Sequence, residues 1–345
     1  METGKKIAQP VLVTGATGFI GRRVVYKLLQ KGIDVKVLAL PNEAIPSEWA
    51  DKIKVLRGSI SDPRSVEEAS AGARTIVHLV AIVTDWGDEK KYWEVTVEGS
   101  RLIFGQAVQN QARVVLASSI AVYGDLIHSQ SCPEETPYGK TFGPYSRTKQ
   151  AQEKLAWDFF KNKSMRLSVV RPANVYGPGS GPWLHDVIDV LQSGSPGLIS
   201  GGEMNAGLAY VDNVADVLIL AGSTERAIGR AYNACDGLDV TWKKYFTDLA
   251  DMIGVGNPKS LPAPLAAVGA YLMEGVYKLF GIQKRPLITR EALNLVGSDN
   301  RIPNERIKNE LGYTPQVSYA EGLERIREYI DQNRGNGVKG HGLLY

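Results

Sequence analysis

The sequence predicts an α/β protein built on a doubly wound parallel sheet, with a smaller and mostly helical lobe attached. Over the first half of the 345 residues, short apolar runs alternate with helical patterns. This alternation is typical of parallel strands that are covered by helices on both faces. After Arg171-Pro172 the alternation loosens and helical patterns dominate, which indicates a second, smaller unit.

The elements predicted for the first half follow one another closely. Residues 11–14 form an apolar run of the kind buried on both faces, and the helical pattern after it ends at Gly32. Asp62-Pro63 places a cap residue before a proline, which is typical of a helix start. The expected strands are 11–14, 35–40, 53–56, 75–79, 114–118 and 167–171, and the longest expected helices are 93–108 and 145–160.

The second half contains fewer strand signals. A glycine- and proline-rich loop is followed by a predicted helix, and residues 209–221 are interpreted as a strand end and a helix that returns to the main sheet. Ser318 and Glu321 form a capping box for the last helix. The remaining predicted helices are 183–191, 262–280 and 290–296.

Composition excludes several classes of protein. The formal net charge is only +3 and no block of basic residues concentrates it, so we expect no nucleic-acid partner. Cys132 and Cys235 lack the spacing of a metal site or a disulfide framework. We find neither a signal-peptide pattern nor an apolar run long enough to span a membrane, and therefore expect a cytoplasmic protein.

A glycine triplet indicates a cofactor site. Gly15, Gly18 and Gly21 lie between an apolar strand and an amphipathic helix, the context in which such a loop holds a pyrophosphate at a helix N-terminus. We therefore expect a Rossmann-type, NAD(P)-binding domain. The expected division is 1–176 and 206–222 for this domain, 177–205 and 223–316 for the interleaved substrate-binding lobe, 317–332 for a C-terminal helix and 333–345 for a flexible tail.

The choice between NAD and NADP stays open at this point. An acidic residue at the end of the second strand would bind the adenosine ribose hydroxyls, and an arginine would pair with a 2′-phosphate. This chain has Leu40-Pro41-Asn42 there, which carries neither mark. Ser59 and Ile60, after the third strand, are expected near the adenine.

Three residues are candidates for catalysis. Tyr145 and Lys149 are four residues apart on one face of a predicted helix, and a fixed positive charge lowers the pKa of a phenol. Tyr145 then becomes a usable general acid or base for interconverting a carbonyl and an alcohol. Ser119 follows the fifth strand, at the sheet edge where open α/β sheets bind ligands. The alternative is that Tyr145 and Lys149 are a solvated pair without function.

Eight motifs are spread over almost the whole chain: TGATGFIG (14–21), HLVA (78–81), VTVEGS (95–100), SSIAVYG (118–124), YSRTK (145–149), RPANVYGPG (171–179), YVDNVAD (210–216) and LGYTP (311–315). Taken together, these motifs resemble the extended short-chain dehydrogenase/reductase family. The resemblance implies catalytic roles for Ser119, Tyr145 and Lys149. Thr96 replaces the asparagine that is usual in the third motif. The expected cofactor contacts are Gly15, Thr17, Gly18, Phe19, Ile20, Gly21, Leu40, Ser59, Ile60, Ala81, Tyr145, Lys149 and Pro172.

Within that family, the sequence is most similar to the 3β-hydroxysteroid dehydrogenase-like branch. Ile120 and Ala121 stand where dehydratases carry Asp-Glu, and the stretch 206–213 lacks the arginine that binds the pyrophosphate in many nucleotide-sugar enzymes. Residues 84–87 (TDWG) and 285–290 (RPLITR) resemble this branch. We expect no metal.

The leading hypothesis is NAD(P)-dependent interconversion of a secondary alcohol and a ketone on a hydrophobic, steroid- or lipid-like substrate. A nucleotide-sugar epimerase or reductase and a non-catalytic NAD(P)-binding regulator are the alternatives. Residues 262–280 are interpreted equally well as a wall of the substrate cleft that touches a membrane surface or as an ordinary packed helix. The resemblance implies a homodimer. Candidate substrate contacts are Thr84, Trp86, Tyr138, Asn174 and Trp183.

Overall fold

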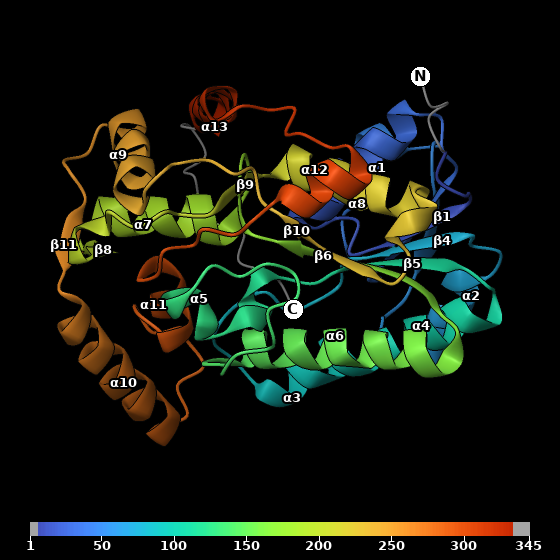
Figure 1. The fold of residues 1–345 in the computed structure, drawn as a ribbon, viewed down its shortest axis with the longest axis horizontal. Helices are drawn as coiled ribbons and strands as arrows, with labels where there is room; N and C mark the ends of the chain where they lie inside the picture. Colours follow the sequence, from blue (N-terminus) through green and yellow to red (C-terminus); the bar gives the residue numbers. More distant parts are fainter. Residues whose placement is uncertain (1–5, 334–345) are drawn as a thin grey trace.

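The structure, a computed structural model, describes residues 6–333 (Figure 1). Its centre is a seven-stranded sheet in the order β10-β6-β5-β4-β1-β2-β3, in which every neighbouring pair is parallel. The predicted doubly wound sheet is therefore confirmed. The strands are β1 (Val11–Thr14), β2 (Val35–Ala39), β3 (Lys54–Arg57), β4 (Thr75–His78), β5 (Arg113–Ala117), β6 (Arg166–Pro172) and β10 (Arg230–Ala234).

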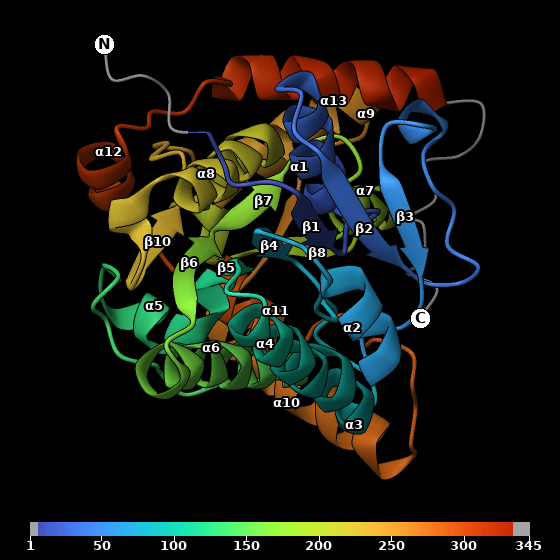
Figure 2. The same ribbon diagram turned by 90° about the vertical axis from the view of Figure 1, so that its right-hand side faces the viewer.

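Helices cover both faces of this sheet (Figure 2). The helices α1 (Phe19–Gln30) and α8 (Val211–Ser223) pack together on one face. On the other face lie α2 (Pro63–Ser70), α4 (Gly99–Gln109) and α6 (Pro144–Lys163). Because successive side chains of a strand point to opposite faces, Val11 and Val13 pack into the hydrophobic core beneath α1 and α8, and Leu12 packs into the core beneath α2 and α4.

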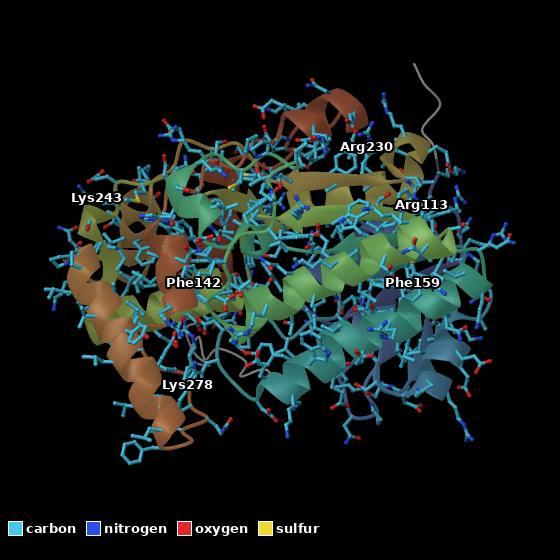
Figure 3. All side chains as sticks on the ribbon, turned by 60° about the horizontal axis from the view of Figure 1, so that its bottom comes forward. Arg113, Phe142, Phe159, Arg230, Lys243 and Lys278 are labelled. Carbon is cyan, nitrogen blue, oxygen red and sulfur yellow. The ribbon has the colours of Figure 1, made fainter. Side chains whose placement is uncertain are left out.

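The smaller lobe continues from the carboxyl edge of the sheet. It contains α7 (Asp186–Ser193), α9 (Trp242–Ile253), α10 (Ala263–Leu279) and α11 (Arg290–Val296), with β8 (Pro196–Ile199) paired parallel to β11 (Lys259–Leu261). Figure 3 shows α10 on the outer edge of the molecule, with Lys278 near its end. In the part of the chain that the structure describes, no helix is both long and apolar enough to cross a bilayer.

The remaining elements are two C-terminal helices and several short helical segments. The helices α12 (Glu305–Leu311) and α13 (Tyr319–Asn333) close the described chain. The residues 93–98 that precede α4 form a π-helical segment, a feature often found at functional sites. This segment is η2 (Trp93–Glu98), and the other short helices are η1 (Ser47–Trp49), α3 (Glu89–Tyr92), η3 (Ile120–Tyr123), α5 (Leu126–Ser129), η4 (Gly181–His185), η5 (Ser200–Gly202) and η6 (Glu225–Ala227).

The structure corrects two of the predicted boundaries. The strand β10 joins the main sheet beside β6, although it lies inside the range 223–316 that we assigned to the lobe. Its Arg-Ala-Tyr-Asn-Ala sequence carries little strand signal, and pairing with β6 is what decides its conformation. The strand at 208–210 (β9, Leu208–Tyr210) pairs with β7 (Asn174–Tyr176) in a separate sheet, while α8 does return to the main sheet. The expected tail lies outside the described residues beyond Asn333.

Candidate active site

The glycine loop after β1 has the geometry of a phosphate cradle. Gly15 has a φ of +69°, which favours glycine. A Cβ on Gly21 would lie 2.1 Å from the carbonyl oxygen of Gly15, so a side chain there would displace the turn. Gly18 caps α1 without any side-chain hydrogen bond, and its residue is exposed. The first N–H groups of α1 therefore remain available to an anion such as a dinucleotide pyrophosphate.

The other predicted cofactor residues follow the carboxyl ends of neighbouring strands. Ser59 and Ile60 follow β3, Ala81 follows β4, and Pro172 ends β6. Because these parallel strands end on the same edge, the residues gather along the edge at which the glycine loop begins. The residues present thus fit the dinucleotide that the fold implies.

Glu43 is a residue that the sequence analysis missed. It lies three residues beyond Leu40, in the turn after β2, and its carboxylate accepts hydrogen bonds from the Thr17 hydroxyl and from the Leu40 N–H, the latter at 2.9 Å. The side chain of Arg57 donates to the carbonyl oxygens of Leu40 and Glu43, which fixes the turn. A carboxylate therefore stands beside the phosphate loop, although none occupies the usual position at the strand end. The only feature of the sequence that could have indicated this role is that Glu43 is an acidic residue close to the end of the second strand.

Ser119 and Tyr145 meet at the end of β5. The backbone N–H of Ala121 donates to Ser119 Oγ at 3.1 Å, which orients the serine, and a hydrogen bond from Ser119 favours the ionised form of Tyr145. Burial is the larger effect, and together with the charge of Glu291 it raises the pKa of Tyr145 to about 12. The expected lowering of this pKa is therefore wrong for the chain as described, because the cost of burying the phenolate dominates.

Lys149, four residues beyond Tyr145 on α6, is buried in a chain of hydrogen bonds. Its ammonium donates to the carbonyl oxygen of Ala117 at 2.7 Å and to Gln152 Oε1 at 2.5 Å. Gln152 donates in turn to Ser100, which bonds to His78 at 2.8 Å. Burial lowers the pKa of Lys149 to about 7, opposed by the negative charge of Glu153. The lysine is therefore poised to change charge near neutral pH.

His78 anchors the far end of this chain. It lies between Thr14 on β1 and Ser100 on α4, with Nδ1 2.7 Å from the threonine oxygen. Burial lowers its pKa to about 3, so it stays neutral at physiological pH. Thr96, in the position where the family motif has asparagine, accepts a hydrogen bond from the N–H of Ile82 at 3.2 Å. It thus supports the loop that follows β4.

Glu291 is a second residue that the sequence analysis missed. It comes from α11 in the lobe, and its Oε1 accepts the backbone N–H of Ser146 at 2.7 Å in the first turn of α6. Its Oε2 is buried without a hydrogen-bond partner among the described residues. Burial and the charge of Asp85 raise the pKa of Glu291 to about 8. A Cβ on Gly143 would lie 1.8 Å from Oε2, so only glycine lets the carboxyl approach.

The candidate substrate residues do not form one group. The Tyr138 hydroxyl donates to the buried carboxylate of Glu153, and Asn174 donates to the carbonyl of Ala206. Trp183 stacks against Trp242 with ring centroids 4.9 Å apart. In the structure, these three side chains make contacts within the fold. Only Thr84 and Trp86 lie in the loop beside the start of α6.

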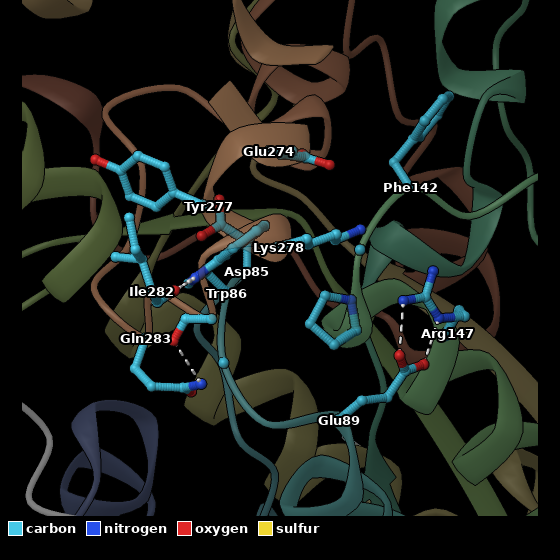
Figure 4. A pocket seen from close by; sticks show the side chains of 14 residues that line it. Asp85, Trp86, Glu89, Phe142, Arg147, Glu274, Tyr277, Lys278, Ile282 and Gln283 are labelled. Atoms are coloured by element: carbon cyan, nitrogen blue, oxygen red, sulfur yellow. Dashed lines mark hydrogen bonds and ion pairs between the residues drawn. The ribbon is translucent and has the colours of Figure 1, made fainter. Parts of the chain in front are cut away.

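That loop holds the lobe against the Rossmann domain (Figure 4). Asp85 forms a bidentate ion pair with Arg285 and accepts a hydrogen bond from Thr289 at 2.6 Å. The indole N–H of Trp86 donates to the carbonyl of Ile282 at 3.1 Å. The two motifs that indicated the hydroxysteroid dehydrogenase-like branch, 84–87 and 285–290, therefore bind each other.

A pocket of about 230 Å³ lies at this junction, between the start of α6 and the end of α10. Arg147 and Glu89 form an ion pair on one side, and Trp86 packs edge-on against Tyr277 on the other, with centroids 6.1 Å apart. Lys278 lies over the Trp86 ring. The lobe thus reaches the helix that carries Tyr145.

Comparison with known proteins identifies the family. Residues 11–235 match the model of the NAD dependent epimerase/dehydratase family. The chain belongs to this family. The predicted membership in the extended short-chain dehydrogenase/reductases is confirmed, and so is the expectation of an NAD(P)-dependent enzyme, since relatives are named as reductases and dehydrogenases.

Three relatives have similar sequence identities to this chain. A 4-hydroxy-2-methyl-3-oxo-4-farnesyl-3,4-dihydroquinoline-1-oxide ketoreductase of Stigmatella aurantiaca is 25% identical, covering 92% of this chain and 95% of the relative. A 2-alkyl-3-oxoalkanoate reductase of Stenotrophomonas maltophilia is 26% identical, with coverages of 92% and 98%. A 3β-hydroxysteroid dehydrogenase/decarboxylase of Arabidopsis thaliana is 25% identical, with coverages of 91% and 78%.

A solved structure supports the fold. The dTDP-glucose 4,6-dehydratase DesIV of Streptomyces venezuelae, with NAD bound, superimposes with a TM-score of 0.75 at 24% identity, covering 94% of this chain and 98% of DesIV. At this identity the likeness concerns the fold.

Proposed function

We propose that this enzyme reduces a ketone on an apolar substrate to a secondary alcohol, with NAD(H) as the cofactor. The observation that carries the proposal is the junction of Ser119, Tyr145 and the buried Lys149 at the carboxyl end of β5. When bound, the dinucleotide supplies the hydride chemistry. The residues of the chain bind, orient and supply the proton.

The protonation states favour the direction of reduction. With a pKa of about 12, Tyr145 carries its proton at neutral pH and can donate it to the oxygen of a carbonyl. Ser119 holds the same oxygen by a second hydrogen bond. Lys149, with a pKa of about 7, lies four residues along the same helix, where its protonated form would place a positive charge on the side of the helix that carries Tyr145.

Two features support an apolar substrate. The stretch 206–213, where many nucleotide-sugar enzymes have a pyrophosphate-binding arginine, contains no arginine, and Ala206 at its start is buried. The relatives named above include reductases of a farnesylated quinoline oxide and of alkyl oxoalkanoates. Both names describe oxo compounds with an apolar substituent, a farnesyl group in one and an alkyl group in the other.

Tyr145→Phe tests the assignment. We expect turnover of 2-alkyl-3-oxoalkanoates or 3-oxosteroids to fall by roughly 10²–10⁴-fold, with cofactor affinity retained. Tyr138→Phe is the matched control, since its hydroxyl bonds to Glu153 instead. Near-normal turnover in Tyr145→Phe would refute the role of Tyr145. Tight binding of a UDP- or dTDP-sugar would favour the epimerase, and cofactor binding without turnover of any ketone would favour the regulator.

Glu43 supports NAD over NADP. A carboxylate in the turn after β2 can accept hydrogen bonds from ribose hydroxyls, whereas a 2′-phosphate would bring a like charge against it. We expect NAD to bind roughly tenfold more tightly than NADP, and Glu43→Gln to reduce that ratio. Calorimetric titration of each cofactor measures it. An unchanged ratio in the variant would refute this role of Glu43.

A further inference from the structure

The outer face of α10 is an exposed apolar surface. Among residues 6–333, nine of the thirteen large apolar side chains that are exposed lie between 265 and 287. Their clustering distinguishes this surface from the isolated exposed side chains that every protein has. These residues are Leu265, Val268, Tyr271, Leu272, Val276, Leu279, Phe280, Ile282 and Leu287, which are 37–79% exposed.

The arrangement along α10 is that of an amphipathic helix with its apolar side outward. Residues 265, 268, 272, 276 and 279 recur at intervals of three and four and form one stripe. The opposite side is buried at Ala266, Ala270 and Glu274. Glu274 accepts hydrogen bonds from Arg290 of α11, so the helix is held to the lobe by its polar side. The orientation of the stripe toward solvent is therefore fixed by a contact.

The exposed charges of the segment that carries the stripe are of one sign. Between 259 and 290 the chain has five basic residues and one acid, Glu274, which is buried. Arg285 and Arg290 are paired with Asp85 and Glu274. The exposed ammonium groups of Lys259, Lys278 and Lys284 have no carboxylate partner among the described residues.

We propose that α10 docks this enzyme on an anionic lipid surface, with its apolar stripe in the acyl–headgroup boundary and its lysines among the headgroups. An apolar stripe bordered by lysines is the pattern of a helix that lies in a membrane interface. A second copy of the chain fits the surface less well. A two-fold pairing of α10 would bring the same three ammonium groups of each copy together without any exposed acid between them.

The docking surface lies beside the pocket at the junction of the lobe and the Rossmann domain. Tyr277 and Lys278, near the end of α10, line that pocket together with Trp86. A lipid-bound α10 would therefore place the pocket close to the layer in which apolar substrates dissolve. The docking itself does not depend on the reaction proposed above.

Sedimentation of the full chain with vesicles tests the proposal. Vesicles of phosphatidylcholine with 30% phosphatidylglycerol are compared with phosphatidylcholine alone, without cofactor or substrate. We expect on the order of tenfold stronger partitioning to the anionic vesicles, reduced by salt. Leu272→Glu/Leu279→Glu should abolish the binding. Tyr26→Glu, at an exposed apolar residue of α1, is the matched control and should retain it.

Each outcome has a defined meaning. Melting temperatures check that the variants remain folded, and Lys259→Gln/Lys284→Gln provides a second, milder test that should weaken anionic binding severalfold. Sedimentation velocity measures self-association in parallel. A dimer that the double glutamate variant dissociates, without vesicle binding by the wild type, would make a second copy the occupant and overturn the proposal. Absence of vesicle binding in the wild type would also overturn it.

Discussion

The buried carboxyl of Glu291 makes stability depend on pH in a way that one substitution isolates. In the folded chain its pKa is about 8, against 4.5 for an ordinary glutamate, because burial and the nearby charge of Asp85 disfavour the carboxylate. The folded state therefore holds a proton that the unfolded state releases above pH 4.5. The stability associated with this proton is fully present below pH 4.5 and is lost as the pH rises through 8.

The magnitude follows from the separation of the two pKa values. Each unit of pH well between them costs about 1.4 kcal/mol. The change is smaller near pH 5 and pH 8, which lie close to the two pKa values, so the wild type should lose on the order of 3 kcal/mol over this range through this group. Glu291→Gln removes the titration and keeps an acceptor for the N–H of Ser146. The free energy of unfolding of the variant should therefore gain about 3 kcal/mol on that of the wild type over this range.

Urea unfolding followed by circular dichroism at pH 5, 6, 7 and 8 measures this difference. Other titrating groups are common to both proteins and cancel. Glu89→Gln is the control, since that carboxylate lies at the same end of α6 but is 57% exposed, and we expect no pH-dependent difference. A difference between wild type and Glu291→Gln that stays constant with pH would refute the reasoning, because it would mean that Glu291 does not titrate there.

Two further substitutions test the glycine loop and a buried ion pair. Gly21→Ala should abolish the rise in melting temperature that the cofactor produces, because the new Cβ would lie 2.1 Å from the carbonyl oxygen of Gly15. Gly105→Ala on α4 is the control, since its Cβ would enter open space, and it should retain the rise. Arg171→Met leaves the fully buried Glu153 without its cation and should lower the free energy of unfolding by about 3–5 kcal/mol. Adding Glu153→Leu should recover part of this loss, because it removes the unpaired buried charge. A loss below about 1 kcal/mol in urea unfolding of Arg171→Met would contradict the prediction.

Local chemistry accounts for what the sequence predicted correctly. The phosphate loop needs only a buried strand, glycines at fixed intervals and a helix start, all within about twenty residues. The strands of the first half follow from the alternation of apolar runs and helical patterns, and the placement of Tyr145 and Lys149 on one helix face follows from the helical repeat. Each inference concerns residues that are neighbours in the chain.

Tertiary structure decided the features that join distant segments. Glu291 reaches Ser146 across 145 positions, Asp85 reaches Arg285 across 200, and β10 becomes a strand by pairing with β6. The pKa of Tyr145 depends mainly on how deeply the phenol is buried, and this desolvation outweighs the hydrogen bond from Ser119. The sequence by itself determined which groups are present and their local spacing. Their burial and their partners arise only when the whole chain has folded, because both are set by atoms from other segments.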